Sequence, residues 1–269
     1  MKIVVLTAVN TNAKYLSCVP LFIDFWRSLK STDNSVTYVP KVLVIASEIP
    51  EELLEYSPWC QLWNVDSEIS SVFASQAIRI LYPAVEECDF VLTTDVDMLP
   101  LSDRMFDSSI NAIRVGAQFV VCRDVLQNQQ YPICYNLASP QVWQSVNGVY
   151  SKRDINVRLS TWFEGIAGDK NYLGDHGGAG WFTDQEKLFQ MVKVFEQEGG
   201  QVTKFADKTT KHRRLDRLFM PFPFNWLFLP AVFQGVFTDY HIHHPAIKNI
   251  RYINQVKRFR DHGFRTRKS

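Results

Sequence analysis

The sequence lacks several features that would assign it to a special class of protein. No run of about 20 apolar residues suits a membrane span, because proline and asparagine interrupt the most apolar late segment, residues 219–237. The apolar run at the N-terminus is too short for a signal peptide, and we expect it to form a strand. Charge of one sign is not in excess, and a net charge of +1 argues against nucleic acid as the partner.

Paired cysteine motifs are also missing. The cysteines are odd in number, widely spaced and form no CxxC motif: Cys18, Cys60, Cys88, Cys122 and Cys134. A disulfide framework or a zinc cluster is therefore not expected. Reduced thiols favour a cytoplasmic location. A cytoplasmic protein of this kind could also attach to the surface of a membrane.

The remaining composition is that of an ordinary globular protein. Hydrophobic residues make up 46% and charged residues 21% of the 269 residues, which is enough for a substantial core. Aromatic residues are frequent at 13%, and a surplus of rings suits a protein that stacks on sugars or bases. No repeat or linker divides the chain, so we predict one domain over 1–269.

Buried strands alternate with helices in the first hundred residues. The apolar runs that predict strands are 2–9, 41–46, 61–65 and 90–94, and helical spacing covers 16–29 and 67–83. This order predicts an α/β fold with a Rossmann-like, mostly parallel central sheet flanked by helices. Further strands are expected at 117–122 and 133–138, and helices at 139–149 and 184–197. The pattern becomes irregular from Gln201 onward and ends in a basic tail.

Two aspartates follow the strand predicted at 90–94. In an open α/β sheet, ligands bind beyond the carboxyl ends of the strands. Asp95 and Asp97 are two residues apart and, on an extended chain, would point to the same side. A carboxylate pair there could hold Mn²⁺ or Mg²⁺ with the phosphates of a substrate. The alternative is that both are solvated turn residues.

The segments KIVVLTAVN and TTDVDMLPL together resemble glycosyltransferases of the GT-A fold, which use nucleotide-sugar donors. The resemblance covers most of the first 190 residues. It implies a nucleotide-binding half at 1–115 and an acceptor and sugar-binding half at 116–269. The residues that it assigns to nucleotide binding are Thr7, Ala8, Asn10, Tyr15, Arg79 and Asp95, and it implies a metal held by Asp95 and Asp97.

Three later segments resemble the retaining family 8 enzymes of this fold. CYNLASPQVW nominates Asn136 for sugar binding, and TDQEKLF nominates Asp184 for sugar hydroxyls and Gln185 for the reactive face. DYHIHHPAIKN nominates His241 or His243 as a further metal ligand and Lys248 for the phosphates. The glycine-rich loop before Asp184 adds sugar or acceptor contacts: His176, Gly178 and Trp181.

Simpler roles are open for several of these residues. Arg79 could pair with Glu86 or Glu87, Asn136 could bond backbone groups, and Asp184 could cap a helix. The basic tail could be a solvated end, or it could contact an anionic acceptor or a membrane surface.

The leading hypothesis is a metal-dependent transferase that moves a sugar, with UDP as the expected carrier, to a glycan, glycolipid or glycoprotein. Retention would need no strong base, whereas inversion would need a carboxylate such as Asp184 or Asp175. The alternatives are a sugar-nucleotide-binding module without chemistry and a phosphatase of the haloacid dehalogenase type. That phosphatase family carries its DxD after the first strand, which ranks it last.

Overall fold

The fold was analysed in a computed structural model. It describes residues 1–32, 34–125, 128–166, 177–178, 180–206, 210, 212–216, 227–242 and 246–268; for 247–248 and 264–268 it describes the backbone only.

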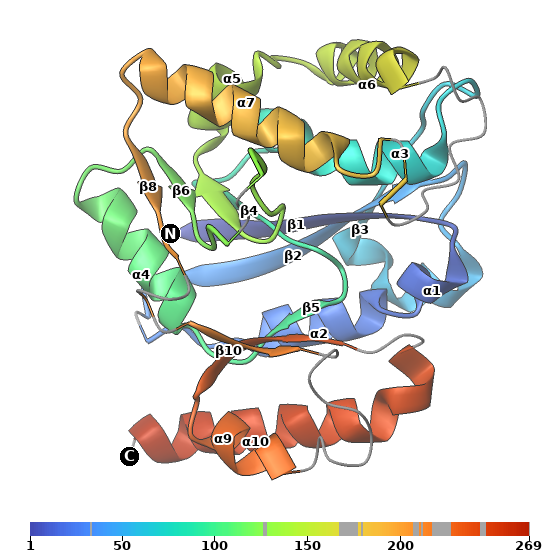
Figure 1. Cartoon of the computed structure of the whole chain (residues 1–269). Coiled ribbons are helices and arrows are strands. Elements are labelled where there is room, and N and C mark those ends of the chain that lie inside the picture. The colour runs from blue at the N-terminus through green and yellow to red at the C-terminus, as the bar shows by residue number, and fades with distance from the viewer. Residues whose placement is uncertain are drawn as a thin grey trace.

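A seven-stranded, mostly parallel sheet forms the centre of the molecule, with the order β3-β2-β1-β4-β7-β6-β8 (Figure 1). Its strands are β1 (Lys2–Asn10), β2 (Thr37–Ile45), β3 (Cys60–Trp63), β4 (Phe90–Thr93), β6 (Phe119–Val121), β7 (Asn136–Ala138) and β8 (Val202–Lys204). β7 is antiparallel to both of its neighbours, β4 and β6. The predicted α/β class, with a mostly parallel sheet flanked by helices, is confirmed.

Helices cover both faces of this sheet. On one face lie α3 (Ser71–Ala77), α5 (Pro140–Asn147), α6 (Lys152–Ile166) and α7 (Thr183–Gln197), and on the other lies α2 (Val19–Ser28) (Figure 1). The remaining helical elements of this part are α1 (Ala13–Leu16), η1 (Glu51–Trp59), η2 (Ile78–Ile80), η3 (Tyr82–Val85) and α4 (Arg104–Arg114).

The sequence of β1 explains this two-sided cover. Every residue of the strand except Lys2 is buried. Ile3, Val5 and Val9 pack in the core on the side of α2, whereas Leu6 and Ala8 pack in the core under α3 and α7. Because side chains alternate along a strand, a continuous apolar run fills both cores at once.

A second, three-stranded sheet lies below α2 in Figure 1, with the order β5-β10-β9. Its strands are β5 (Met98–Pro100), β9 (Arg213–Asp216) and β10 (Phe237–His241), and it is followed by η6 (Ala246–Asn249) and α10 (Ile250–Lys268); α9 (Leu229–Phe233) precedes β10. β5 follows the two aspartates directly, so this sheet joins the end of the chain to the end of β4.

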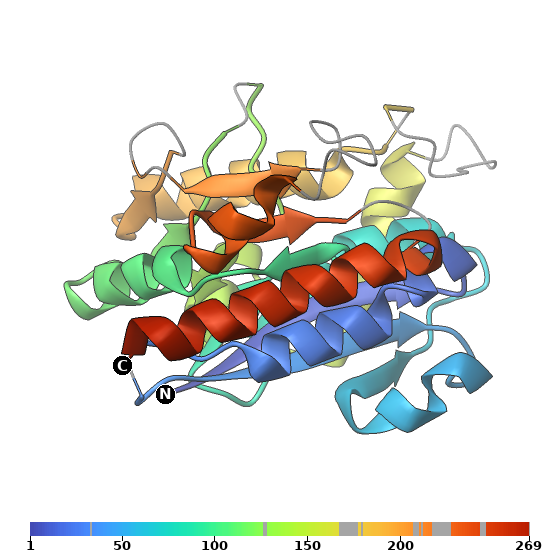
Figure 2. The same cartoon turned by 90° about the horizontal axis from the view of Figure 1, so that it is seen from below.

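The basic C-terminal segment is a packed helix, not a solvated end. α10 runs beside α2 (Figure 2), and Arg260 is fully buried between them. Its Nη1 donates to the carbonyl oxygens of Phe25 and Pro100, both at 3.1 Å, and its Nη2 donates to Ser28 Oγ at 2.6 Å. These bonds connect α10 to α2 and to β5.

Candidate active site

The site begins at the carboxyl end of β4, beside the parallel strand β1. β4 ends at Thr93, and the chain turns before β5, with the Met98 N–H donating to the Asp95 carbonyl at 3.2 Å. Asp95 and Asp97 therefore lie in a turn, and the prediction that they point to the same side of an extended chain is wrong. Their side chains bond to different partners.

Asp95 and Asp184 both pair with Arg79. The guanidinium donates from Nη1 to Asp95 Oδ1 and from Nη2 to Asp184 Oδ2, the latter at 2.9 Å. The alternative partner Glu86 is instead bonded to Lys41, at 2.5 Å. Arg79 lies in the short helix η2, because the helix predicted at 67–83 breaks into α3, η2 and η3. Arg79 thus pairs with two other predicted site residues, Asp95 and Asp184, and its role in nucleotide binding stays a prediction.

Asp184 is 3% exposed and lies in the first turn of α7, after the N-cap residue Phe182. The helix-cap alternative is therefore wrong. Its Oδ1 accepts the N–H of Gln185 at 2.8 Å. Burial raises the pKa of this carboxyl to about 6, Arg79 lowers it, and Asp95 raises it. The raised value therefore reflects mainly burial of the carboxyl group, to which the charge of Asp95 adds.

Asp97 meets His241 because of strand pairing. In the second sheet His241 lies opposite Met98 on one side and opposite Asp216 on the other. The imidazole Nε2 is 3.3 Å from Asp97 Oδ2, and Nδ1 is 3.3 Å from Asp216 Oδ2. A neutral imidazole can donate to only one of these carboxylates. The other contact requires either a second proton on the ring or a cation between the two groups.

These donors fit a divalent cation such as Mn²⁺ in chemistry but form only part of a coordination sphere. Ligands about 2.1 Å from a cation, at right angles to each other, lie about 3 Å apart, close to the separation of Asp97 and His241. A carboxylate on the other ring nitrogen, as Asp216 provides, orients a ligating histidine. Within the described residues no three His, Cys, Asp or Glu side chains are grouped for a metal, since Asp95 is turned to Arg79.

Asp216 was not predicted from the sequence. It belongs to a basic stretch whose only obvious property is its charge, and its contact with His241 depends on the register between β9 and β10. No local pattern specifies that register.

The residues predicted for nucleoside binding divide between interior and surface. Thr7 is fully buried, and within the described structure its Oγ1 has no hydrogen-bond partner. Ala8 is nearly buried. Asn10 lies at the end of β1, where its Nδ2 donates to Ser71 Oγ at 3.3 Å. Tyr15 is half-buried beneath the Lys14 ammonium, 5.1 Å from the ring centre. In this group, Asn10 ends β1 and Tyr15 lies in α1 just after it, so these two are at the carboxyl end of the strand.

Asn136 bonds backbone groups, as its simpler role predicted. The side chain is fully buried opposite Thr93 in the β4–β7 pair. Its Nδ2 donates to the carbonyl oxygens of Pro132 and Ile133, at 2.8 and 3.0 Å. These bonds fix the loop before β7 against the end of β4.

The remaining predicted residues lie near the start of α7 or outside the described residues. Trp181 and Gln185 are half-buried, and Gly178 is exposed. The N–H of Trp181 donates to the Gly178 carbonyl at 3.1 Å. His176 and His243 lie outside the described residues, as does the side chain of Lys248, whose backbone belongs to η6.

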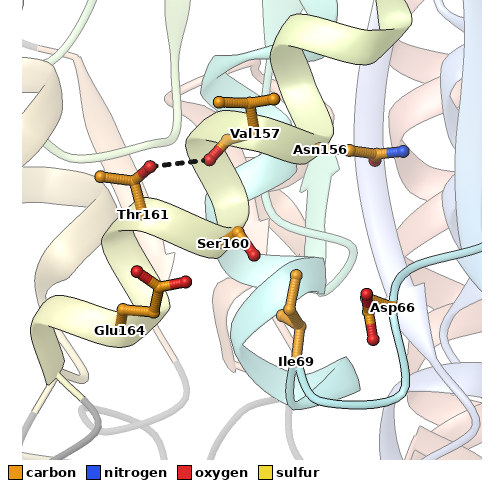
Figure 3. Close-up of a pocket in the computed structure, with 7 residues that line it drawn as sticks. All are labelled: Asp66, Ile69, Asn156, Val157, Ser160, Thr161 and Glu164. Carbon is orange, nitrogen blue, oxygen red and sulfur yellow. Dashed lines mark hydrogen bonds between the residues drawn. The ribbon is translucent and has the colours of Figure 1, made fainter.

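A separate polar pocket of about 540 Å³ lies between α6 and the turn before α3 (Figure 3). The residues that line it are Asp66, Ile69, Asn156, Val157, Ser160, Thr161 and Glu164. None of the predicted site residues is among them. Its carboxylates, hydroxyls and amide could bond a hydroxyl-rich ligand.

Comparison with protein-family models and with curated proteins gives no match. Among solved structures, the chain is similar to the galactosyltransferase LgtC in complex with donor and acceptor sugar analogs, with 16% identity over 98% of this chain and 95% of that one and a TM-score of 0.43. It is also similar to the glycosyltransferase GlyE in Streptococcus pneumoniae TIGR4, with 12% identity over 97% of this chain and a TM-score of 0.48. The chain spans 60% of the length of GlyE. Similarity this low assigns neither a family nor an activity, so function has to be inferred from the site itself.

Proposed function

We propose that this protein is a metal-dependent glycosyltransferase of the GT-A type. It moves a sugar from a nucleoside diphosphate, UDP-sugar being the first candidate, to a hydroxyl of a glycan, glycolipid or glycoprotein. The observation that carries the proposal is the imidazole of His241 held between two carboxylates, Asp97 and Asp216, at the sheet edge where Arg79 pairs with Asp95. Such an edge suits a cation and a pyrophosphate together.

Each residue has a role in this proposal. Asp97 and His241 would hold Mn²⁺ or Mg²⁺, with Asp95, which is paired with Arg79 in this structure, as a further candidate ligand. The ion supplies charge stabilisation for the departing diphosphate. Asp184 accepts hydrogen bonds from the sugar hydroxyls, and Gln185 lies at the reactive face. Arg79 keeps Asp184 in place through the 2.9 Å ion pair.

The stereochemical outcome follows from the base that is available. A retaining transfer needs no strong base, because the leaving phosphate oxygen takes the acceptor proton. Asp184 is almost fully buried and bonded to Arg79, which favours sugar binding over activation of an acceptor. We therefore propose retention, which the anomeric configuration of the product tests by NMR.

Two other functions use the same residues. A sugar-nucleotide-binding module would need the same metal site but would show no turnover. A haloacid dehalogenase-type phosphatase is disfavoured because the aspartate pair follows β4, whereas that family carries it after the first strand.

The proposal is tested by thermal shift with nucleoside diphosphates and nucleotide sugars, with and without Mn²⁺. A ligand that binds the native state raises the melting temperature by mass action, so the correct base should stand out. Labelled donors then test for hydrolysis or transfer. We expect Asp97→Asn to abolish the Mn²⁺-dependent shift and at least 99% of turnover, because a metal ligand is lost.

Glu87→Gln is the matched control, since it removes one exposed carboxylate before β4 and away from the site. It should leave both readouts unchanged. Binding without turnover in any donor would favour the module, and the absence of metal-dependent nucleotide binding would remove the proposal altogether.

Membrane-surface contact is a second part of the proposal. No helix among the described residues combines the length and the apolar character that a bilayer span requires. An apolar groove of about 560 Å³ runs between α9 and α10, lined by Pro230, Phe233, Gln234, Gln255, Arg258, Phe259 and His262. Apolar and basic groups together suit an anionic membrane surface, where a lipid-linked acceptor would lie. The cytoplasmic location stays a prediction.

A further inference from the structure

A second charged cluster lies one step along the sheet from His241. On β9 and β10 the cross-strand partners are Arg214 with Asp239 and Asp216 with His241. Because side chains two residues apart on a strand share a face, the Arg214–Asp239 pair is next to the Asp216–His241 pair. The candidate metal residues therefore have a guanidinium as their neighbour on the same sheet face.

Two guanidinium groups share one carboxylate in this cluster. Asp239 is fully buried, and its Oδ2 accepts from Arg214 Nε at 2.9 Å and from Arg123 Nη1 at 3.1 Å. Its Oδ1 accepts from Thr238 Oγ1 at 3.1 Å. One carboxylate thus accepts from two guanidinium groups. Since Arg123 is buried, the charge that a ligand could reach belongs to Arg214.

The Arg214 guanidinium has an outer edge whose Nη1 donates no hydrogen bond within the described residues, and we call it the unused edge. Its Nη2 donates to the Cys134 thiol at 3.4 Å, and Nη1 has no hydrogen-bond partner in the part of the chain that the structure describes. The side chain is 22% exposed. Burial raises the pKa of Cys134 to about 11, so the sulfur is a neutral, weak acceptor at pH 7. The Nε bond to Asp239 fixes the guanidinium plane and leaves the outer donors available.

The unused edge belongs to the same site as the aspartate pair. Cys134 is within electrostatic range of Arg214 and also of Asp95, and Arg79 is in range of Cys134. Cys134 thus contacts Arg214 and lies near the Arg79–Asp95 pair. A planar guanidinium fixed at Nε presents parallel N–H groups on its outer edge that match two phosphate oxygens.

We infer that Arg214 binds a phosphate group of the donor diphosphate from the β9–β10 side of the site. This inference rests on the proposed function and adds an anion-binding residue that no sequence motif indicated. The positive charge of Arg214 would offset negative charge on the phosphates from the β9–β10 side, while Asp97 and His241 would hold the cation.

The test measures the binding of inorganic pyrophosphate with Mn²⁺, a probe that is independent of the base and the sugar. Arg214→Gln removes the charge, and we expect its pyrophosphate affinity to fall by about tenfold or more, because a charge-assisted bond is lost. Arg213→Gln is the matched control, since this neighbour is exposed and on the opposite strand face. It should bind like the wild type.

Mn²⁺ binding alone, followed by electron paramagnetic resonance, separates a direct role from a structural one. Arg214→Gln should keep the wild-type Mn²⁺ affinity; loss of Mn²⁺ binding in this variant would overturn the inference, as would unchanged pyrophosphate affinity. Should Arg214→Gln fail to fold, Arg214→Lys keeps a positive charge beside Asp239 but lacks the planar guanidinium. A pyrophosphate affinity of Arg214→Lys equal to that of Arg213→Lys would overturn the inference. A wild type that binds neither pyrophosphate nor any nucleoside diphosphate would instead refute the proposed function.

Discussion

One guanidinium, that of Arg79, serves two carboxylates, and this shapes the chemistry of the site. Asp95 is 34% exposed and Asp184 almost fully buried, so water compensates the first and not the second. If a cation draws Asp95 away, Arg79 is left to Asp184 alone. Under the proposed function, metal binding on one side of Arg79 would thus be coupled to the charge of Asp184 on the other.

The pH dependence of unfolding should report the state of Asp184. Its folded pKa of about 6 lies above the ordinary value of about 4, a difference that corresponds to roughly 3 kcal/mol. A raised folded pKa contributes stability below pH 4 that is lost as the pH rises through 6. The free energy of unfolding of the wild type, minus that of Asp184→Asn, should therefore fall by up to roughly 3 kcal/mol between pH 4 and 7 in urea titrations.

Asp154→Asn is the control with the opposite sign. Hydrogen bonds from Tyr150 and Ser151 hold the pKa of Asp154 below its ordinary value. This difference should therefore rise with pH below about 4 and stay level between pH 4 and 7. If the difference for Asp184→Asn also rose with pH, the attraction of Arg79 would outweigh burial at that carboxyl.

The sequence predicted those site residues whose chemistry is visible in a local motif. Arg79 pairs with Asp95 and Asp184, and Asp97 lies beside His241, so these residues form two groups joined by the turn after β4. It did not predict the residues whose role depends on strand register.

Asp216 and Arg214 become site residues through their positions opposite His241 and Asp239. Conversely, Thr7 and Asn136 lie in segments that the resemblance assigned to ligand binding, but both side chains are fully buried. Spacing along the chain does not reveal whether a side chain faces the interior or the surface of the protein.

Among the elements, α9 and α10 approach each other most closely at Gly263. A β-carbon added there would overlap the carbonyl oxygen of Phe233, which is backbone and cannot swing away. We expect Gly263→Ala to destabilise the fold by about 1–3 kcal/mol and to lower the melting temperature by about 3–10 °C. Thermal unfolding followed by circular dichroism measures this.

Gly165→Ala isolates helix propensity from packing. Gly165 lies in α6, is exposed, and has open space where a β-carbon would be. Alanine should stabilise this helix by up to about 1 kcal/mol. A Gly263→Ala protein as stable as Gly165→Ala would show that the two C-terminal helices separate readily.

Strands buried on both faces were the most predictable elements, and the C-terminal helix was the least. The run at 2–9 and the run at 90–94 correspond to β1 and β4 within one residue. α10 escaped prediction because arginines interrupt its apolar spacing, and one of them, Arg260, is itself buried. Its backbone partners on α2 and β5 come from segments more than 150 residues earlier.

At the scale of the whole molecule, we compare the exposed apolar and basic side chains on the two sides of the central sheet. On the side of α9 and α10, Leu227 is 73% exposed, just before α9, and Arg258 lies on the groove. On the opposite side α6 exposes Val157 and Arg153 (Figure 1). Single exposed apolar residues are common, so the apolar groove between α9 and α10 is what distinguishes the first side.

Membrane contact should therefore depend on one side of the molecule. We expect the protein to co-sediment with vesicles containing phosphatidylserine more than with phosphatidylcholine vesicles. Leu227→Ser with Arg258→Glu should weaken this binding at least about fivefold, since one basic residue near an anionic surface contributes about 1 kcal/mol. The matched pair Val157→Ser with Arg153→Glu makes the same changes on α6 and should bind as the wild type does. An equal loss in both pairs would mean that overall charge, and not the groove between α9 and α10, directs the protein to lipid.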